Sequence, residues 1–281
     1  MKHTAKQLPR AAFPSLLLEI PQPPEHLWVR GELPSSELIY LSVVGSRKIS
    51  SYGKQVIEHI VGGLAQYPIC IVSGLALGVD AYAHEMALKH HLKTIAVPGS
   101  GLSDNALYPR SHLSLAKRIV DSGGCLLSEF EPEFKATPWS FPMRNRIMAG
   151  MSHGTLIIEA REKSGTLITA RLTTDYNREL FVVPGNIFSE NSKGVHQFLK
   201  LGATPVTDAS DICEALHIPL KQVEPEDITN LDELSDDAQL VFKILQEPLS
   251  FETLILSLRL ESTRVSVALT ELELMGLISQ R

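Results

Sequence analysis

The sequence predicts an α/β protein with a doubly wound, mostly parallel sheet and a small helical domain at its C-terminal end. Short β-rich runs alternate with amphipathic helical segments from residue 38 to about residue 215. Most of the runs are continuously apolar, as in strands that are buried on both faces. Repeated strand–helix units favour right-handed crossovers, which place helices on both faces of the sheet.

Length and composition favour a globular protein of two domains. With 281 residues the chain exceeds the usual single-domain size. No apolar run reaches the roughly 20 residues that span a membrane, and the N-terminus does not resemble a signal peptide. The three cysteines, Cys70, Cys125 and Cys213, are far apart in the sequence. A reduced, cytoplasmic protein without a membrane span is the simplest interpretation.

Residues 1–35 are predicted to form an extended, proline-rich arm rather than a helix. Five prolines lie within residues 14–34. Proline lacks the backbone N–H that a helix interior requires, so a run of prolines interrupts helical structure.

The sheet domain is predicted over residues 36–216. Its strands are expected at 39–44, 69–72, 94–97, 125–127, 155–158 and 180–183. Helical patterns at 54–65 and 79–90 place their apolar residues on one stripe, as in helices that cover a sheet. A further helix is expected to begin near Arg144.

Residues 217–235 are acidic and polar and are predicted to form a linker, after which residues 236–281 form a winged-helix-like domain. Three helices are expected there, at 236–246, 250–258 and 262–275. Ser250 and Ser262 are the expected N-caps, and Gly276 is expected to end the third helix. Leu277 and Ile278 would begin a short wing.

The net charge of −6 is unevenly distributed. Residues 221–281 hold 5 Lys or Arg against 12 Asp or Glu, whereas residues 1–220 hold 21 against 20. Residues 135–178 hold seven bases against three acids, a local excess of +4. A local positive surface of this kind indicates a binding groove for an anion, although a solvated surface is the alternative.

Several turns follow predicted strands, where an open α/β sheet binds ligands. Gly45, Ser46 and Arg47 follow the first of these strands, and backbone N–H groups at the next helix start favour a phosphate there. The alternative is an ordinary tight turn. The turn 73–80 lacks the spacing of a dinucleotide fingerprint, and its Asp80 is explained by the helix dipole. A third turn, 98–101, is expected at the same edge.

The stretch Phe141–Arg146 places an aromatic ring, two guanidinium groups and an amide within six residues. Such a cluster can stack a base and hold phosphates. Pro138 and Pro142 are expected to keep the chain extended, leaving Trp139 or Phe141 available for stacking. Core packing is the alternative for Phe141.

Ser164, Gly165 and Thr166 offer hydroxyl and backbone donors at a predicted helix start, where they would either bind phosphate or only cap the helix. Glu129 and Glu159 lie near strand ends, where they would either act as an acid or base or orient Arg47 or Arg144 by ion pairing. No metal site is expected, because the His84–Glu85 pair lacks the spacing of a zinc helix.

Five motifs, in their order along the chain, resemble those of the DprA (Smf) family of DNA-processing proteins. They are GSR at 45–47, SGLALGVD at 73–80, PGSG at 98–101, FPMRNRIMAG at 141–150 and SGTLITA at 164–170. The resemblance implies an extended Rossmann fold that dimerises and has no cofactor. It also implies cooperative binding of single-stranded DNA, protection of incoming DNA and loading of the RecA recombinase during natural transformation.

Carried over by position, Arg47 resembles the phosphate-binding arginine and Phe141–Arg146 the strand-binding element of this family. The full candidate DNA-binding set is Gly45, Ser46, Arg47, Ser73, Gly74, Lys135, Phe141, Arg144, Asn145, Arg146, Ser164, Gly165 and Thr166. Arg47→Ala or Arg144→Ala is expected to abolish most binding of oligo-dT while leaving the fold intact. The third helix of the C-terminal domain lacks a basic face, so that domain is expected to have a protein-interaction or regulatory role.

Three functions are therefore considered. The favoured one is a non-enzymatic mediator that binds single-stranded DNA, with RecA and a second copy of the chain as partners. The alternative is a nucleotide phosphoribohydrolase like those of the lonely-guy family, although their PGGxGTxxE motif is absent: Pro98–Gly101 is followed by Leu-Ser-Asp-Asn. The third is an interaction scaffold with neither property.

Overall fold

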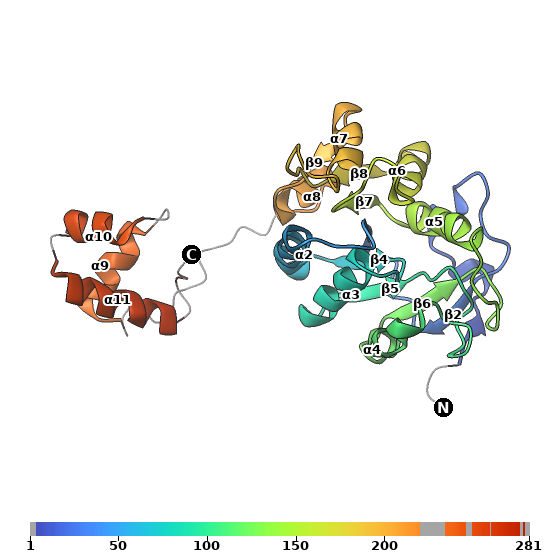
Figure 1. Cartoon of the computed structure of the whole chain (residues 1–281). Coiled ribbons are helices and arrows are strands. Elements are labelled where there is room, and N and C mark those ends of the chain that lie inside the picture. Colours follow the sequence, from blue (N-terminus) through green and yellow to red (C-terminus); the bar gives the residue numbers. More distant parts are fainter. Residues whose placement is uncertain (1–3, 220–233, 246–248, 259, 276–277, 279–281) are drawn as a thin grey trace. The chain divides into compact units, whose positions relative to one another are not determined.

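The computed structural model describes residues 4–219, 234–245, 249–258, 260–275 and 278 (Figure 1). The chain divides into two compact units, residues 1–220 and 221–281. Most of the predicted linker lies outside the described residues.

The larger unit is built on a nine-stranded sheet with the strand order β1-β2-β6-β5-β4-β3-β7-β8-β9. The strands are β1 (Lys6–Gln7), β2 (Trp28–Gly31), β3 (Ile39–Val44), β4 (Ile69–Ser73), β5 (Lys93–Ala96), β6 (Cys125–Ser128), β7 (Gly154–Ile157), β8 (Glu179–Val182) and β9 (Thr204–Pro205). Strands β3 to β9 pair in parallel, whereas β2 pairs antiparallel with β6 and β1 pairs antiparallel with β2. The order reverses beside β3, so the predicted doubly wound, mostly parallel sheet is confirmed.

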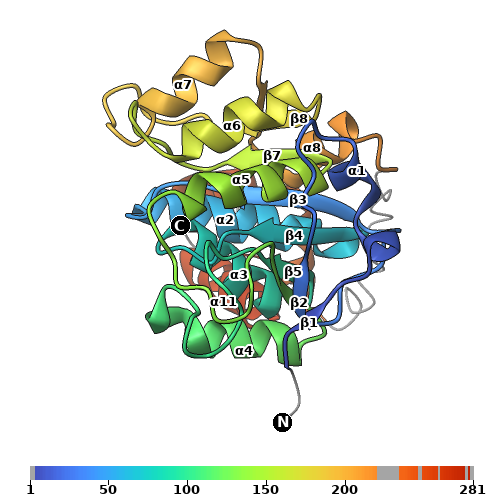
Figure 2. The same ribbon diagram turned by 90° about the vertical axis from the view of Figure 1, so that its right-hand side faces the viewer.

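Helices cover both faces of this sheet (Figure 2). They are α1 (Ser15–Leu18), α2 (Ser51–Gly63), α3 (Val79–Lys89), α4 (Leu113–Asp121), α5 (Ser140–Met151), α6 (Thr166–Asp175), α7 (Lys193–Lys200) and α8 (Ala209–Ala215). One face buries side chains of α1, α5, α6 and α7 against the sheet, and the other buries those of α2, α3, α4 and α8. Burial on both faces explains why the strands are continuous apolar runs.

The N-terminal segment differs from the predicted extended arm. Residues Ser15–Leu18 form a helical turn, and Trp28–Gly31 pairs with Cys125–Ser128 as a strand of the main sheet. Leu17 and Leu27 are fully buried. Local proline content did not reveal this pairing, because the partner strand lies about a hundred residues away and supplies the hydrogen bonds and the apolar contacts.

The smaller unit contains α9 (Asp236–Ile244), α10 (Phe251–Leu258) and α11 (Ser262–Leu274), which pack around a small apolar cluster. All three predicted helices are present. Ser250 accepts the N–H of Thr253 at 3.2 Å, as a cap does. The expected cap Ser262 is instead the first helical residue, after an extended Glu261. Gly276 and Leu277, where the helix end and the start of the wing were expected, lie outside the described residues, and Ile278 packs against the apolar cluster.

Within the described part of the chain, no helix is long and apolar enough to cross a membrane.

Candidate nucleic-acid-binding site

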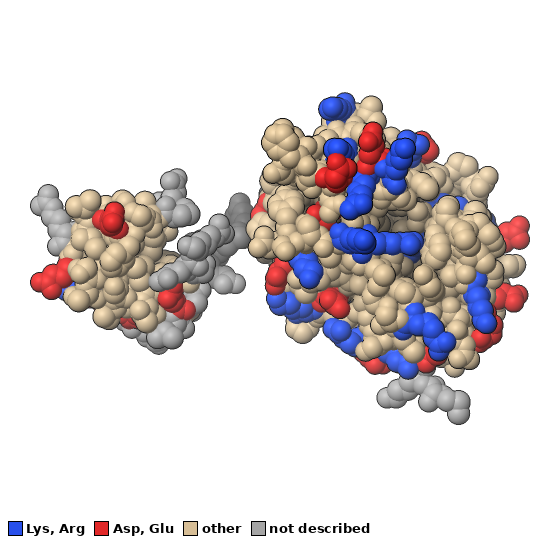
Figure 3. All heavy atoms as spheres, viewed as in Figure 1, with Lys and Arg blue, Asp and Glu red and all other residues tan. Residues whose placement is uncertain are grey.

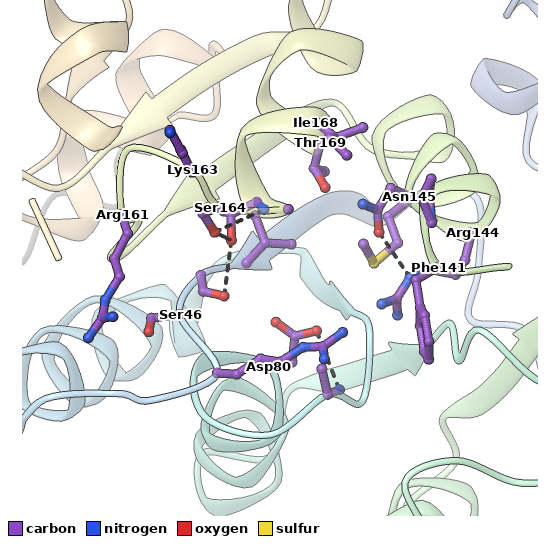
Figure 4. A pocket seen from close by; sticks show the side chains of 18 of the residues that line it. Ser46, Asp80, Phe141, Arg144, Asn145, Arg161, Lys163, Ser164, Ile168 and Thr169 are labelled. Atoms are coloured by element: carbon purple, nitrogen blue, oxygen red, sulfur yellow. Dashed lines mark hydrogen bonds between the residues drawn. The ribbon is translucent and has the colours of Figure 1, made fainter. Parts of the chain in front are cut away.

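A pocket of about 350 Å³ opens at the carboxyl ends of β3 and β7, where the strand order reverses (Figure 4). This is the position at which open α/β sheets bind their ligands. Nine of the predicted residues line it, namely Gly45, Ser46, Arg47, Phe141, Arg144, Asn145, Ser164, Gly165 and Thr166. Three segments that are far apart in the sequence therefore meet in one pocket.

Close backbone approaches hold the β3–α2 loop against the start of α3. A Cβ atom on Gly45 would lie 2.7 Å from the Val79 side chain. Gly78 has a φ of +79°, and a Cβ atom there would lie 2.3 Å from the Ser46 carbonyl oxygen. The Val79 N–H donates to that same carbonyl at 3.1 Å. Both positions therefore require glycine, the residue that permits such contacts and a positive φ.

The hydroxyls of the β7–α6 loop are used within the protein. The Thr166 hydroxyl donates to the Gly45 carbonyl at 3.1 Å, which joins the two loops. Ser164 Oγ accepts the Thr166 N–H at 3.2 Å and donates to Thr166 Oγ1 at 3.0 Å. Gly165, rather than Ser164 or Thr166, occupies the N-cap position of α6, and Ser164 binds the first N–H of the helix from just outside it. A Cβ atom on Gly165 would meet nothing within 4 Å, so this glycine faces open space.

Exposed cations surround the pocket, and they gather around a hollow in the surface (Figure 3). The charged ends of Arg47, Lys48 and Lys163 have no hydrogen bond or ion pair within the described residues. Arg161, also exposed, donates from Nε to Asn191 Oδ1 at 3.3 Å. Several unpaired positive charges at the mouth of one pocket attract an anionic ligand. The sequence predictions missed Lys48, Arg161 and Lys163 as site residues, although their positions just beyond strand ends could have identified them.

Phe141 lies in the first turn of α5, not in an extended segment. The helix begins at Ser140, four residues before the predicted start, because proline is tolerated in a first helical turn and Pro142 does not interrupt it. The ring is partly buried. A Cβ atom on Gly99 would lie 2.6 Å from Phe141 Cδ1, and the Tyr108 ring centroid is 5.7 Å away. The Arg47 guanidinium lies 5.4 Å from the Phe141 ring centroid, within cation–π range.

Trp139, the other ring expected to stack, lines neither the pocket nor its rim. It is 55% exposed and contacts Phe130 and Phe134 edge-on in a separate aromatic cluster.

Arg144 is buried and holds the ends of two strands together. Its Nη1 donates to the Gly74 carbonyl at 2.5 Å and to the Val97 carbonyl, and its Nε donates to Asn145 Oδ1 at 3.1 Å. A Cβ atom on Gly74 would lie 2.0 Å from Arg144 Nη1, so the guanidinium requires glycine there. The prediction that Arg144 is dispensable for the fold therefore disagrees with the structure.

Charges around Arg144 are balanced within the protein. Burial lowers the pKa of Arg144 to about 10, while Asp80 opposes this shift. Burial likewise raises the pKa of Asp80, and Arg144 opposes that shift. Asp80 therefore does more than interact favourably with the dipole of α3, because its carboxylate also balances the buried guanidinium of Arg144.

Four predicted site residues do not line the pocket. Arg146 pairs with Glu129 and donates to the Gln22 carbonyl at 2.8 Å, so it fixes the N-terminal segment. The Ser73 hydroxyl is buried and donates to the Val43 carbonyl at 2.6 Å. Lys135 is exposed in the β6–α5 loop, and Gly74 borders a neighbouring hollow.

The two carboxylates at strand ends have other partners than those expected. Glu159 accepts the N–H of Ser50 at 3.0 Å and also its hydroxyl, at the start of α2. Glu129 pairs with Arg146. The alternative in which they pair with Arg47 or Arg144 is therefore wrong. Across the described residues, no group of three or more His, Cys, Asp or Glu is arranged to hold a metal ion.

Comparison with known proteins places this architecture in a family. A family model described as DNA recombination-mediator protein A matches residues 7–217, and one described as DprA winged helix domain matches residues 224–281. Protein Smf of Escherichia coli K12 is 41% identical over 208 residues, which cover 74% of this chain and 55% of that protein. DNA processing protein DprA of Bacillus subtilis 168 is 38% identical over 205 residues, covering 73% and 68%. The chain thus spans about half the length of the Escherichia coli relative.

Two solved structures share the fold. The X-ray structure of DNA processing protein A from Streptococcus pneumoniae aligns with a TM-score of 0.67 and 34% identity, over 76% of this chain and 74% of that one. The Helicobacter pylori protein of the same name, described for its single-stranded DNA binding mode, aligns with a TM-score of 0.67 and 29% identity, over 77% and 98%. The winged-helix prediction and the family resemblance are confirmed, and the chain belongs to the DNA recombination-mediator protein A family.

Proposed function

We propose that this chain is a non-enzymatic recombination mediator that binds single-stranded DNA in the pocket between β3 and β7. It would shield incoming DNA and load RecA during natural transformation. The observation that carries the proposal is the set of exposed, unpaired cations around one pocket at the reversal of strand order. The DNA-binding mode described for the Helicobacter pylori relative supports the same ligand.

Phosphate recognition follows from the placement of these cations. Arg47, Lys48 and Lys163 rise from two adjacent loops and can contact a backbone that crosses the pocket. Each phosphate contact releases counterions, so binding should weaken steeply as salt rises. Contacts of this kind carry no sequence information, so little preference among bases is expected.

Assembly and compartment belong to the same proposal. We expect a cytoplasmic homodimer formed through the larger unit. Ile187, Phe188 and Leu201, on the loop before α7 and at its end, are 70%, 87% and 79% exposed and are candidates for the contact. The smaller unit is expected to bind a protein such as RecA, because most of its charges are acidic. Light scattering of the purified chain tests the dimer, and a monomer at all concentrations would contradict it.

The function itself is tested by titrating labelled oligo-dT with the protein at two salt concentrations. Tight binding that weakens at the higher salt is expected, whereas no binding at low salt would contradict the proposal. Incubation with AMP separates the nucleotide phosphoribohydrolase alternative. No adenine should be released, and its release in proportion to protein would favour the enzyme.

A further inference from the structure

The second helix of the smaller unit, α10, is apolar around most of its circumference. Five of its eight residues are large and apolar, within the sequence Phe-Glu-Thr-Leu-Ile-Leu-Ser-Leu. At about 100° per residue, these side chains span an arc of about 200°, which runs from Leu254 through Phe251 and Ile255 to Leu256. A helix that only covers a core needs an apolar stripe of about 100°. The apolar surface of α10 is therefore wider than its place in the unit requires.

Only one side of this arc is covered within the smaller unit. Leu254 is 2% exposed, and Leu258 packs against the apolar cluster of the three helices (Figure 1). On the other side, Phe251 and Leu256 are 41% and 78% exposed, and Ile255 between them is half-buried. Single exposed apolar residues are common, but neighbouring ones on successive turns form a continuous surface that is typical of a contact site.

The charges of the smaller unit indicate what kind of partner fits this surface. Residues 221–281 hold 5 Lys or Arg against 12 Asp or Glu. The one base of α11, Arg264, already donates to both carboxylate oxygens of Asp237, at 2.7 and 2.5 Å. A winged helix that reads DNA needs free bases on its third helix, so an anionic partner does not fit.

Two exposed carboxylates flank the apolar side of α10. Glu252 lies four residues before Leu256, on the same edge of the helix, and Glu261 follows shortly after the helix ends. Neither side chain forms an ion pair within the described residues. A complementary surface would therefore be apolar along its centre and would carry Lys or Arg beside that apolar stripe.

We propose that the exposed side of α10, formed by Phe251, Ile255 and Leu256, docks a basic amphipathic helix of a protein partner. The inference rests on the protein-binding role proposed for the smaller unit, and it is independent of DNA binding in the larger one. Apolar contact with α10 supplies the affinity, as in other helices that bind through one apolar face. Pairing with Glu252 and Glu261 orients the partner helix and favours basic sequences.

The test titrates the full chain into a fluorescein-labelled synthetic helix of leucine and lysine, with all its leucines on one face. Fluorescence anisotropy should show saturable binding. Leu256→Ser should weaken this binding about tenfold, the order of effect that follows when one leucine is no longer buried. Leu256→Met keeps an apolar side chain and should retain most of the affinity. Glu252→Gln should weaken binding a few fold and reduce its salt dependence, because it removes one flanking charge.

Two controls separate docking from general adsorption to an acidic protein. Val267→Ser replaces an apolar side chain that is 67% exposed on α11, so it should leave the affinity unchanged. A peptide of the same composition whose leucines are spread around the helix should bind far more weakly. Hydrogen exchange locates the contact: the amphipathic peptide should slow exchange in Phe251–Leu258 more than in Ser262–Leu274.

No saturable binding to the wild type, or equal losses for Leu256→Ser and Val267→Ser, would overturn the docking site. A change of oligomeric state in Leu256→Ser without peptide would assign the surface to a second copy of the chain and also overturn it. Leu256→Ser should bind oligo-dT as the wild type does. If neither protein binds oligo-dT, the proposed DNA-binding function fails, and the peptide titration still decides the docking site by itself.

Discussion

Two arginines at the same pocket have opposite environments. Arg47, in the β3–α2 loop, is exposed and has no hydrogen bond or ion pair among the described residues. Arg144, on α5, is 5% exposed and donates to two backbone carbonyls and one side chain. A guanidinium whose donors are already used inside the protein is part of the scaffold. One whose donors are free is available to a ligand.

The same contrast holds between α5 and the loops as whole regions. Arg146 on α5 is also buried and pairs with Glu129. The loops after β3 and β7 instead carry Lys48 and Lys163, both exposed. In this chain α5 therefore fixes the geometry of the pocket, and the loops supply the charge that faces the ligand.

The largest expected effect is on stability. Arg144→Ala removes the donor of two buried carbonyls and the main positive charge that opposes Asp80, so the free energy of unfolding should fall by about 3 kcal/mol. Urea denaturation followed by circular dichroism measures this. Arg144→Lys keeps the charge and should lose less. If the unfolding midpoint of Arg144→Ala equals that of the wild type, the guanidinium is not part of the scaffold.

Arg47→Ala should weaken DNA binding without destabilising the fold, whereas the main effect of Arg144→Ala is on stability. A hydrogen bond to a charged group contributes about 1.5–3 kcal/mol, so affinity for oligo-dT should fall at least roughly tenfold. The free energy of unfolding should stay within about 0.5 kcal/mol of the wild type, because the side chain is exposed. A destabilised Arg47→Ala protein would remove the distinction between the two arginines.

Buried His84 makes the scaffold sensitive to acid. Its Nδ1 lies 2.7 Å from Thr94 Oγ1, its Nε2 is buried without a partner, and burial lowers its pKa from 6.5 to about 3. Between these values the unfolded chain binds a proton that the folded chain does not. The free energy of unfolding should therefore fall as pH drops from 6.5 toward 3. The equilibrium constant for unfolding should rise by up to about tenfold for each pH unit.

Urea titrations across this pH range measure the effect of His84. Replacing it by Gln should flatten the profile below pH 6.5, where the imidazole contributes. An unchanged slope in the variant would assign the acid sensitivity to other groups.

The smallest expected effect is that of Lys163→Ala. Exposed ion pairs contribute about 1 kcal/mol or less, so oligo-dT affinity should fall only a few fold, with no change in the urea midpoint. Fluorescence anisotropy at low salt resolves such a difference. An effect as large as that of Arg47→Ala would mean that the β7–α6 loop shares the main phosphate contact equally.

The sequence predicted the sheet well because its strands are buried on both faces. Ile39–Val44 and its parallel neighbours are apolar runs that contrast with the helices between them, and the observed strands end within one residue of those expected. The strand Trp28–Gly31 was not predicted, because its partner strand β6 is distant in the sequence and prolines dominate its surroundings.

At the site, sequence could name the segments but not the partners of each side chain. Arg47, Arg144 and Arg146 are alike as residue types, and the difference between them arises from Gly74, Val97, Gln22 and Glu129, which only the fold brings close. The orientation of Phe141 likewise depends on Gly99, a residue of another loop.

The salt dependence of oligo-dT binding tests the central claim most directly, when wild type and Arg47→Ala are compared. Single-stranded DNA gives a slope of about −0.7 in log affinity against log salt for each phosphate neutralised. The account predicts a steep wild-type slope that becomes shallower by about this amount for each phosphate that Arg47 contacts. Equal slopes and equal affinities for the two proteins would show that Arg47 does not bind the phosphate backbone.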